Sequence, residues 1–285
     1  MILHHNRQAL AKGGIAIWGP ERTRGGLMSG LLKGTRLNAP EVLAQQARNC
    51  GLIAVEMARL KQAGTRQLLV SEENMLGSLR GNFKVSMLYP GARQRLARIA
   101  QAFGGDCRRI GLSIRPYQDY WASALAHAIP RGLAAPGEDD LDRLVTQPRS
   151  WRRMIEDVVA AFPGVDIAVW EFDRLKARPQ AQLRLLTGAG GCLAPARVHA
   201  NAAPDRAELR QALLDRGKLA AAAMVPAGRG PYQPFAAHHM DALQAQYHSD
   251  LAWLRQCTSA RIRFDEQVEQ AAPAIPAPAR KRGTA

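Results

Sequence analysis

Short apolar runs alternate along this chain with long segments whose apolar residues recur at helical spacing, and this alternation constrains the fold most. The runs predict buried strands, since continuous apolar stretches of about four to eight residues are typical of strands covered on both faces. We expect strands at Ile15–Trp18, 67–71, Arg109–Ile114 and 165–170. We expect helices at Pro40–Gln62, 91–103, 119–129, 151–162 and 236–255. This order predicts a three-layer α/β fold, with a mostly parallel sheet flanked by helices.

Length and composition fit one domain, which we assign to residues 1–270. A chain of 285 residues with 47% hydrophobic residues can bury a substantial core. Gly, Ala and Pro dominate 189–204 and 226–234, which predicts loops there. The Ala/Pro-rich segment 271–285 ends in basic residues and predicts a disordered tail. No apolar run approaches the roughly 18–20 residues that cross a bilayer, and nothing reads as a signal peptide, so we expect a cytoplasmic protein without a membrane partner.

The formal charge of the chain is large, at +15, but it does not by itself indicate a nucleic-acid partner. Basic residues are spread along the chain, whereas a nucleic-acid-binding surface normally combines a concentrated basic patch with aromatic residues. This distribution argues against nucleic acid and favours a small polyanionic nucleotide. The cysteines show neither a CxxC nor a metal-ligand pattern and predict isolated thiols. They are Cys50, Cys107, Cys192 and Cys257.

One strand-to-helix junction predicts a phosphate site. The strand Arg109–Ile114 leads to Arg115, Pro116 breaks it, and Ser123 follows in the next helix, eight residues beyond the arginine. A guanidinium at a strand end and a hydroxyl two turns into the helix can converge on one phosphate. The alternatives are a surface salt bridge for Arg115 and a hydrogen bond from Ser123 to its own helical turn.

Two glutamates follow the strand 67–71 at its carboxyl end, the edge of a parallel sheet where ligands bind. Glu73 is our candidate general base, and Glu72 is the second choice. Either could instead be an N-cap or first-turn carboxylate of the following helix. No metal site is predicted, because adjacent residues such as His238 and His239 should point in different directions.

Together these stretches resemble the bacterial sulfotransferase family, a variant of the P-loop NTPase fold, over roughly residues 6–255. Arg115 and Ser123 match its 3′-phosphate motif. The stretch Leu-Val-Ser-Glu-Glu-Asn at 69–74 is similar to the family's strand-end "SxE" sequence, and 169–175 is similar to its "YEDL" sequence.

A fourth stretch, Arg229-Gly230 followed by Phe235, resembles the loop that closes on the adenosine diphosphate moiety in this family. The resemblance implies 3′-phosphoadenosine 5′-phosphosulfate as co-substrate and sulfuryl transfer to an unknown hydroxyl or amine of a small molecule or glycan. It assigns nucleotide binding to Arg115, Ser123, Arg229 and Gly230, and the role of base to Glu73.

The chain departs from the family at its beginning. Family members start with a strand and a Gly/Lys/Thr-rich loop that wraps the 5′-phosphosulfate. Residues 1–4 would begin that strand, but they run directly into 5–10, which resembles the far end of the first helix. The missing loop implies impaired or absent catalysis, unless the basic loop 22–24 replaces it. The alternatives are a non-catalytic nucleotide-binding module and a basic nucleic-acid-associated protein.

Overall fold

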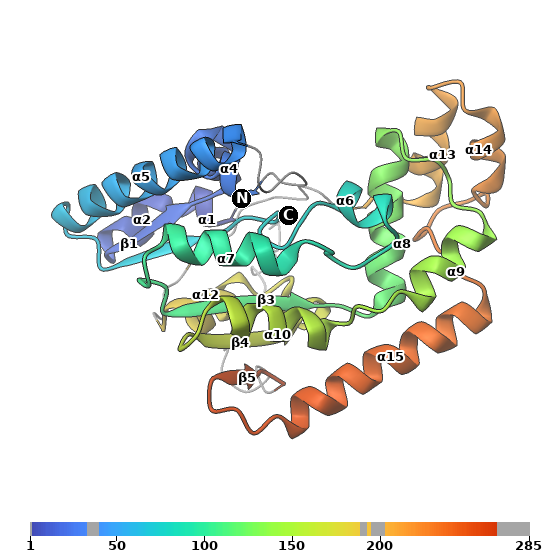
Figure 1. Ribbon diagram of the computed structural model, residues 1–285. Helices are drawn as coiled ribbons and strands as arrows, with labels where there is room; N and C mark the ends of the chain where they lie inside the picture. Colours follow the sequence, from blue (N-terminus) through green and yellow to red (C-terminus); the bar gives the residue numbers. More distant parts are fainter. Residues whose placement is uncertain (1, 33–39, 189–192, 195–202, 267–285) are drawn as a thin grey trace, which may run out of the picture.

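The computed structural model describes residues 2–32, 40–188, 193–194 and 203–266 (Figure 1). It shows an α/β fold whose strands form two small parallel sheets flanked by helices. The first sheet pairs β1 with β2, and the second has the order β3-β4-β5. The strands are β1 (Ile15–Trp18), β2 (Gln67–Val70), β3 (Arg109–Ile114), β4 (Asp166–Glu171) and β5 (Ile262–Phe264).

The predicted strands correspond to β1 to β4, but the strand expected to begin at residues 1–4 is wrong. Residues Ile2–His5 form the short helix α1, and the backbone N–H of Asn6 closes its turn on the carbonyl of Ile2 at 3.1 Å. Ile2 and Leu3 pack on the cluster around Leu10, so the apolar run is used as one helix face. No strand therefore lies between the two sheets among the described residues.

The long helices agree with the sequence to within a few residues. They are α5 (Pro40–Gln62), α7 (Ala92–Ala102), α8 (Tyr117–Ala128), α10 (Trp151–Ala161) and α15 (Ala237–Gln256). The helix α2 (Arg7–Lys12) corresponds to the helix end that the sequence indicates at 5–10. Other shorter helices were not expected: α4 (Ser29–Leu32), α6 (Leu79–Lys84), α9 (Glu138–Thr146), α11 (Phe172–Leu175), α12 (Pro179–Thr187), α13 (Arg206–Leu214) and α14 (Leu219–Met224). The loop expected at 226–234 is confirmed, while most of 189–204 and all of 271–285 lie outside the described residues.

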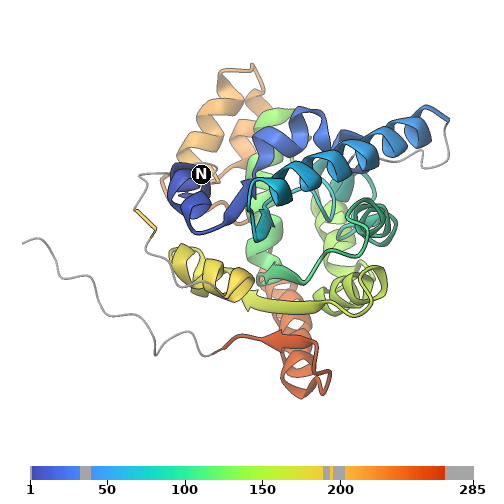
Figure 2. The same ribbon diagram turned by 90° about the vertical axis from the view of Figure 1, so that its left-hand side faces the viewer.

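Helices join the two sheets on both faces (Figure 2). On one face, α12 packs against both β2 and β3. On the other, α7 packs between α5 and α10. One core cluster contains Trp18 at the end of β1, Leu112 of β3 and Leu251 of α15, so residues from both sheets share a core.

The three cysteines in the described residues, Cys50, Cys107 and Cys257, are free thiols, as predicted. Within the described ranges, no helix has both the length and the apolar character needed to cross a membrane.

Candidate functional site at the carboxyl ends of the strands

Arg115 is the first residue after β3 and lies at its carboxyl end, as the sequence predicts. Its guanidinium carbon lies 5.1 Å from the ring centroid of Phe172, the residue that follows β4. Its ion pair is with Asp173, whose Oδ2 lies 3.8 Å from Nε of Arg115. This Nε is buried and has no hydrogen-bond partner among the described residues. Stacking and packing therefore hold the cation, and hydrogen-bond donors are left over.

Neighbouring carboxylates balance the charge of Arg115. Oδ1 of Asp173 also binds Nζ of Lys176 at 2.6 Å, so Asp173 is shared between two cations. Asp119 lies in the first turn of α8. Burial raises the pKa of Asp119 above its ordinary value, and the positive charge of Arg115 opposes that shift. The surroundings of Arg115 therefore combine both signs of charge.

Ser123 lies on α8, four residues after Asp119, so the two residues share a face of the helix. The residue is half-buried. Its hydroxyl forms no hydrogen bond within the described part of the chain, so the alternative of a serine bonded to its own turn is not observed. Arg115 and Ser123 therefore both keep free hydrogen-bonding capacity.

Glu72 is locked in a hydrogen-bond cluster at the end of β2. Its side chain is fully shielded from solvent, and its oxygens accept bonds from Oγ1 of Thr23 at 2.5 Å, Nη2 of Arg24 at 2.8 Å and the backbone N–H of Asn74 at 2.9 Å. Burial alone would raise the pKa of Glu72, but these hydrogen bonds outweigh it and hold the pKa below its ordinary value. Glu72 is therefore a charged anchor, near neutral pH, for the loop that carries Thr23 and Arg24.

Glu73 is exposed, with 67% of its side chain accessible, and Nη2 of Arg24 lies 3.2 Å from its Oε2. The helix that follows, α6, takes its N-cap from Ser78, whose Oγ accepts the N–H of Gly81 at 3.2 Å. The alternative of Glu72 or Glu73 as a helix cap is therefore wrong. Of the two glutamates, Glu73 is the one that a molecule in solvent can reach.

The basic loop 22–24 does not offer free cations. Nη2 of Arg22 pairs with Oε2 of Glu56 on α5, and the Arg22 guanidinium carbon lies 5.5 Å from the ring centroid of Trp18. Arg24 binds both Glu72 and Glu73. Both guanidinium groups are thus committed to carboxylates.

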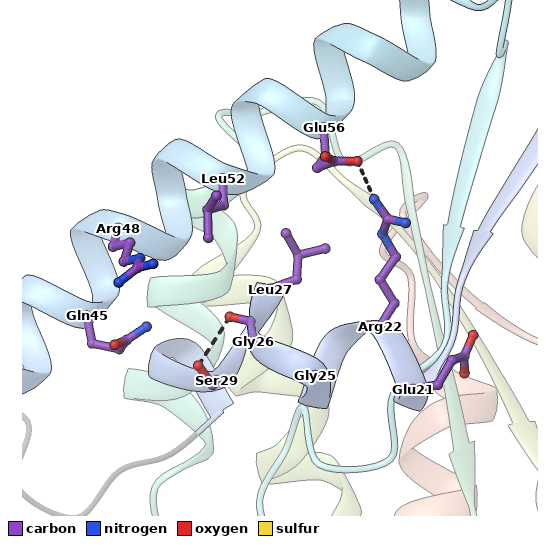
Figure 3. Close-up of a pocket in the computed structure, with 10 residues that line it drawn as sticks. All are labelled: Glu21, Arg22, Gly25, Gly26, Leu27, Ser29, Gln45, Arg48, Leu52 and Glu56. Atoms are coloured by element: carbon purple, nitrogen blue, oxygen red, sulfur yellow. Dashed lines mark hydrogen bonds and ion pairs between the residues drawn. The ribbon is translucent and has the colours of Figure 1, made fainter.

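Beyond this loop lies a pocket of about 460 Å³ between residues 21–29 and α5 (Figure 3). Cations and anions line it in equal number, as Arg22 and Arg48 against Glu21 and Glu56. Figure 3 shows the Arg22–Glu56 ion pair reaching from the loop to the helix. This balance is unlike a phosphate cradle, in which unpaired donors converge.

Asn49 of α5 fixes the shape of this pocket, and the sequence did not single it out. The side chain is fully buried, donates from Nδ2 to the carbonyl of Gly26 at 2.6 Å, and accepts the N–H of Gly30 at 2.7 Å. Gly26 has φ of 123°, a conformation that disfavours other residues. An asparagine on the inward face of a long helix, together with a preceding Gly-Gly, is the signal that could have identified this contact.

Arg229 and Gly230 lie in the loop before α15, where their carbonyls bind Arg206 at the start of α13. The carbonyl of Arg229 accepts Nη2 of Arg206 at 2.7 Å, and that of Gly230 accepts its backbone N–H at 2.9 Å. No hydrogen bond or ion pair joins Arg229 or Gly230 to Arg115 in the described ranges. The structure thus fixes the Arg229–Gly230 loop to α13.

The two histidines at the start of α15 do converge, contrary to the expectation that they diverge. Their ring centroids lie 4.0 Å apart, and possible ligand atoms of Asp142, His238 and His239 lie within 4.8 Å of one another. Both ring nitrogens of the buried His239 are already used, Nδ1 by the N–H of Ala236 at 3.3 Å and Nε2 by Oδ1 of Asp142 at 2.7 Å. This arrangement joins α15 to α9 without requiring an ion.

Tyr117 closes a buried network at the junction of three helices. Its hydroxyl donates to Oδ2 of Asp250 on α15 and accepts the N–H of Trp151 at the start of α10 at 2.6 Å. Asp250 also accepts the N–H of Trp151 at 3.1 Å. The Tyr117 side chain is fully buried, so it belongs to the core. This network orients α8, the helix that carries Ser123.

No protein-family model matches this chain, and it matches neither a curated protein nor a solved structure. The class of this protein is therefore defined only by its fold and its site. It is an α/β protein with charged clusters at the carboxyl ends of its parallel strands.

Proposed function

We propose that this chain is a sulfotransferase-like protein, with a sheet of the P-loop NTPase type, that binds the 3′-phosphate of an adenine nucleotide beside Arg115. The observation that supports the proposal best is the unused hydrogen-bonding capacity of this guanidinium. Its terminal nitrogens form no hydrogen bond among the described residues, and its ion pair with Asp173, made through the buried Nε, is long at 3.8 Å. A guanidinium stacked on an aromatic ring and free to donate suits bidentate phosphate binding.

The other arginines at the strand ends are less suitable. Arg22 is committed to Glu56, and Arg24 is committed to Glu72 and Glu73. Ser123 supplies a second free donor on the helix that begins next to Arg115. The two donors belong to a strand end and to the helix that follows it, which is the arrangement that the family resemblance implies.

In a complete enzyme of this kind, an acceptor oxygen or nitrogen attacks the sulfur of 3′-phosphoadenosine 5′-phosphosulfate. The bond from sulfur to the phosphate oxygen breaks, the acceptor's proton passes to a base, and adenosine 3′,5′-bisphosphate leaves. Glu73 is the exposed carboxylate available as the base. Charge stabilisation at the phosphosulfate needs donors or cations that are not already paired, and the loop 22–24 has none in its arginines. We therefore infer binding with little or no turnover.

Calorimetry with adenosine 3′,5′-bisphosphate tests the proposal. We expect weak binding that is at least about tenfold weaker in Arg115→Ala, since each charge-assisted hydrogen bond contributes roughly 1.5–3 kcal/mol. Arg174→Ala is the matched control, because Arg174 is an exposed arginine that follows the neighbouring strand β4, on α11, and is not the arginine of the proposed phosphate site. Adenosine 5′-monophosphate, which lacks the 3′-phosphate, should not distinguish wild type from Arg115→Ala. Binding that is unaffected by Arg115→Ala contradicts the assignment.

A sulfuryl-transfer assay with a generic phenolic acceptor then separates an enzyme from a non-catalytic module. We expect no turnover above background for the wild-type chain. Robust turnover that Glu73→Gln abolishes would instead assign catalysis to this site.

A further inference from the structure

The backbone edges of β2 and β3 face each other without being paired. In both views the strands lie in the order β1, β2, β3, β4 and β5 (Figures 1 and 2). β2 pairs with β1, and β3 pairs with β4, and no register joins β2 to β3. Both run in the same direction, with their carboxyl ends toward α6 and α8 (Figure 1).

The hydrogen-bond alternation identifies the groups on the open edge of β2. The N–H groups of Gln67 and Ser71 donate to the carbonyls of Gly14 and Trp18 on the side of β1. In a parallel ladder these bonds alternate along the strand, so the N–H groups of Leu68 and Val70 point away from β1. These two donors have no partner among the described residues.

The same reasoning applies to β3. The N–H of Asp166 donates to the carbonyl of Arg108, and the register pairs Arg109 with Asp166. The main-chain groups of even-numbered β3 residues therefore bind β4, while those of Gly111 and Ser113 point to the open edge. Gly111 is exposed to solvent. The face of the strand is crowded at this position, because a Cβ on Gly111 would lie 2.4 Å from Cδ2 of Leu186. The accessible part of Gly111 is therefore its main chain.

Two strands in the middle of the order, β2 and β3, are unusually exposed. In a parallel sheet covered by helices, inner strands are the most buried. Here the inner β4 and the outer β1 are mostly buried, whereas no residue of β2 is buried and β3 has an exposed centre. Solvent thus reaches the middle of the strand layer.

The first residues of β2 and β3 are held at a common point. Nε2 of Gln67 donates to the carbonyl of Thr187, and Nη1 of Arg109 donates to that of Leu185, both in the last turn of α12. Both contacts are made by long side chains, and no ladder joins the two main chains beside this helix. An intervening strand requires about 10 Å between them.

We propose that the open edges of β2 and β3 bind one extended, apolar peptide strand, parallel to both. Only a strand can pair with backbone groups on two sides at once. Its side chains must be apolar on both faces, because Leu68 and Val70 join the core cluster on one face and Leu69 joins the cluster of Ile15 and Ile17 on the other. Its length is four to six residues, the lengths of β2 and β3.

This proposal does not depend on nucleotide binding, and either can fail alone. The strand would end between Glu72 and Arg115, so residues that follow it would lie beside the proposed phosphate site. Occupation of the edges by a second copy of this chain is the competing outcome.

The probe is a fluorescent peptide with the core Val-Ile-Val-Leu-Val between flanking lysines, added to the full-length chain. We expect a rise in anisotropy and about tenfold slower amide exchange at Leu68, Val70 and Gly111, measured by NMR. The exchange of Leu69 and Leu112, whose N–H groups face β1 and β4, should change little. A peptide with proline at its centre, which removes one N–H, should bind about tenfold more weakly.

Two proline variants of the protein test the same backbone contact. Leu68→Pro removes an N–H at the open edge and should weaken peptide binding about tenfold while the chain stays folded. Leu69→Pro removes an N–H bound to β1 and should lower the unfolding midpoint much more. The proposal is overturned if the apolar peptide does not bind, if it binds no better than its proline counterpart, or if the free chain is a dimer with Leu68 and Gly111 already protected.

Discussion

Gln67 and Arg109, the first residues of β2 and β3, donate hydrogen bonds to carbonyls only two residues apart in the last turn of α12. The carboxyl end of a helix carries a partial negative charge, which favours a guanidinium at that position. This contact holds the starts of two unpaired strands in line and so sets the relative positions of their carboxyl ends.

Arg109→Ala should lower the free energy of unfolding by about 1–2 kcal/mol, because it removes the hydrogen bond to the carbonyl of Leu185 and the ion pair with Asp166. Urea unfolding measures this change. Arg108→Ala is the control, since Arg108 is exposed and should alter stability by less than about 0.5 kcal/mol. Equal effects of both variants would contradict the role given to Arg109.

Asn49→Ala should destabilise the chain by about 2–4 kcal/mol. It leaves the buried N–H of Gly30 without a partner, which costs roughly 1–3 kcal/mol, and it removes one of two hydrogen bonds to the carbonyl of Gly26, which also accepts Oγ of Ser29 at 3.2 Å. Asn49→Asp restores the acceptor for Gly30 but not the donor for Gly26, so it should lie between Asn49→Ala and wild type. Thermal unfolding of the three proteins checks this order.

Glu72 should make stability depend on pH in the acid range. Its pKa is lowered by hydrogen bonding despite burial, so its contribution is complete above its ordinary pKa of 4.5 and is lost as the pH falls through the lower folded value. Glu72→Gln should be less stable than wild type by about 1–3 kcal/mol at pH 7, with the difference shrinking below about pH 4. Glu73→Gln, at an exposed position, should change the free energy of unfolding at pH 7 by less than about 0.5 kcal/mol.

Tyr117→Phe should cost about 1–3 kcal/mol, since it removes the donor to the buried Asp250 and an acceptor for the N–H of Trp151. Burial raises the pKa of Asp250, and loss of the Tyr117 hydrogen bond should raise it further. The stability loss should therefore be larger at pH 7 than at pH 4. Guanidinium unfolding at both pH values measures the difference, and a loss independent of pH would exclude this network as its cause.

The sequence predicted those parts of the fold that carry long, regular apolar patterns. The bounds of β3 and α5 were predicted to the residue. Each element carries one regular apolar pattern over its whole length, which is six residues in β3 and 23 residues in α5. β5 was missed because its two apolar residues, Ile262 and Phe264, alternate with Arg261 and Arg263 and form no continuous apolar run. The start of the chain was misjudged because two apolar residues, Ile2 and Leu3, fit a helix face as well as a strand.

The candidate site was predicted in its positions but not in its pairings. Arg115, Glu72 and Glu73 do follow the expected strands, because a strand's end is a local property of the sequence. Which carboxylate is shielded depends on Thr23 and Arg24, which lie 49 and 48 residues away from Glu72. No periodicity reports such long-range contacts, so the difference between Glu72 and Glu73 required the structure.

The interruption between β2 and β3 has a mechanical consequence. A continuous sheet transmits force through backbone hydrogen bonds, whereas here α7 and α12 span the two groups of strands by side-chain contacts. Side-chain contacts slide more easily than paired strands, so small shear between β1–β2 and β3–β4–β5 is the softest motion that we expect of this molecule. Such shear would change the separation of Glu73 and Arg115 directly, because each follows a strand on a different side of the interruption.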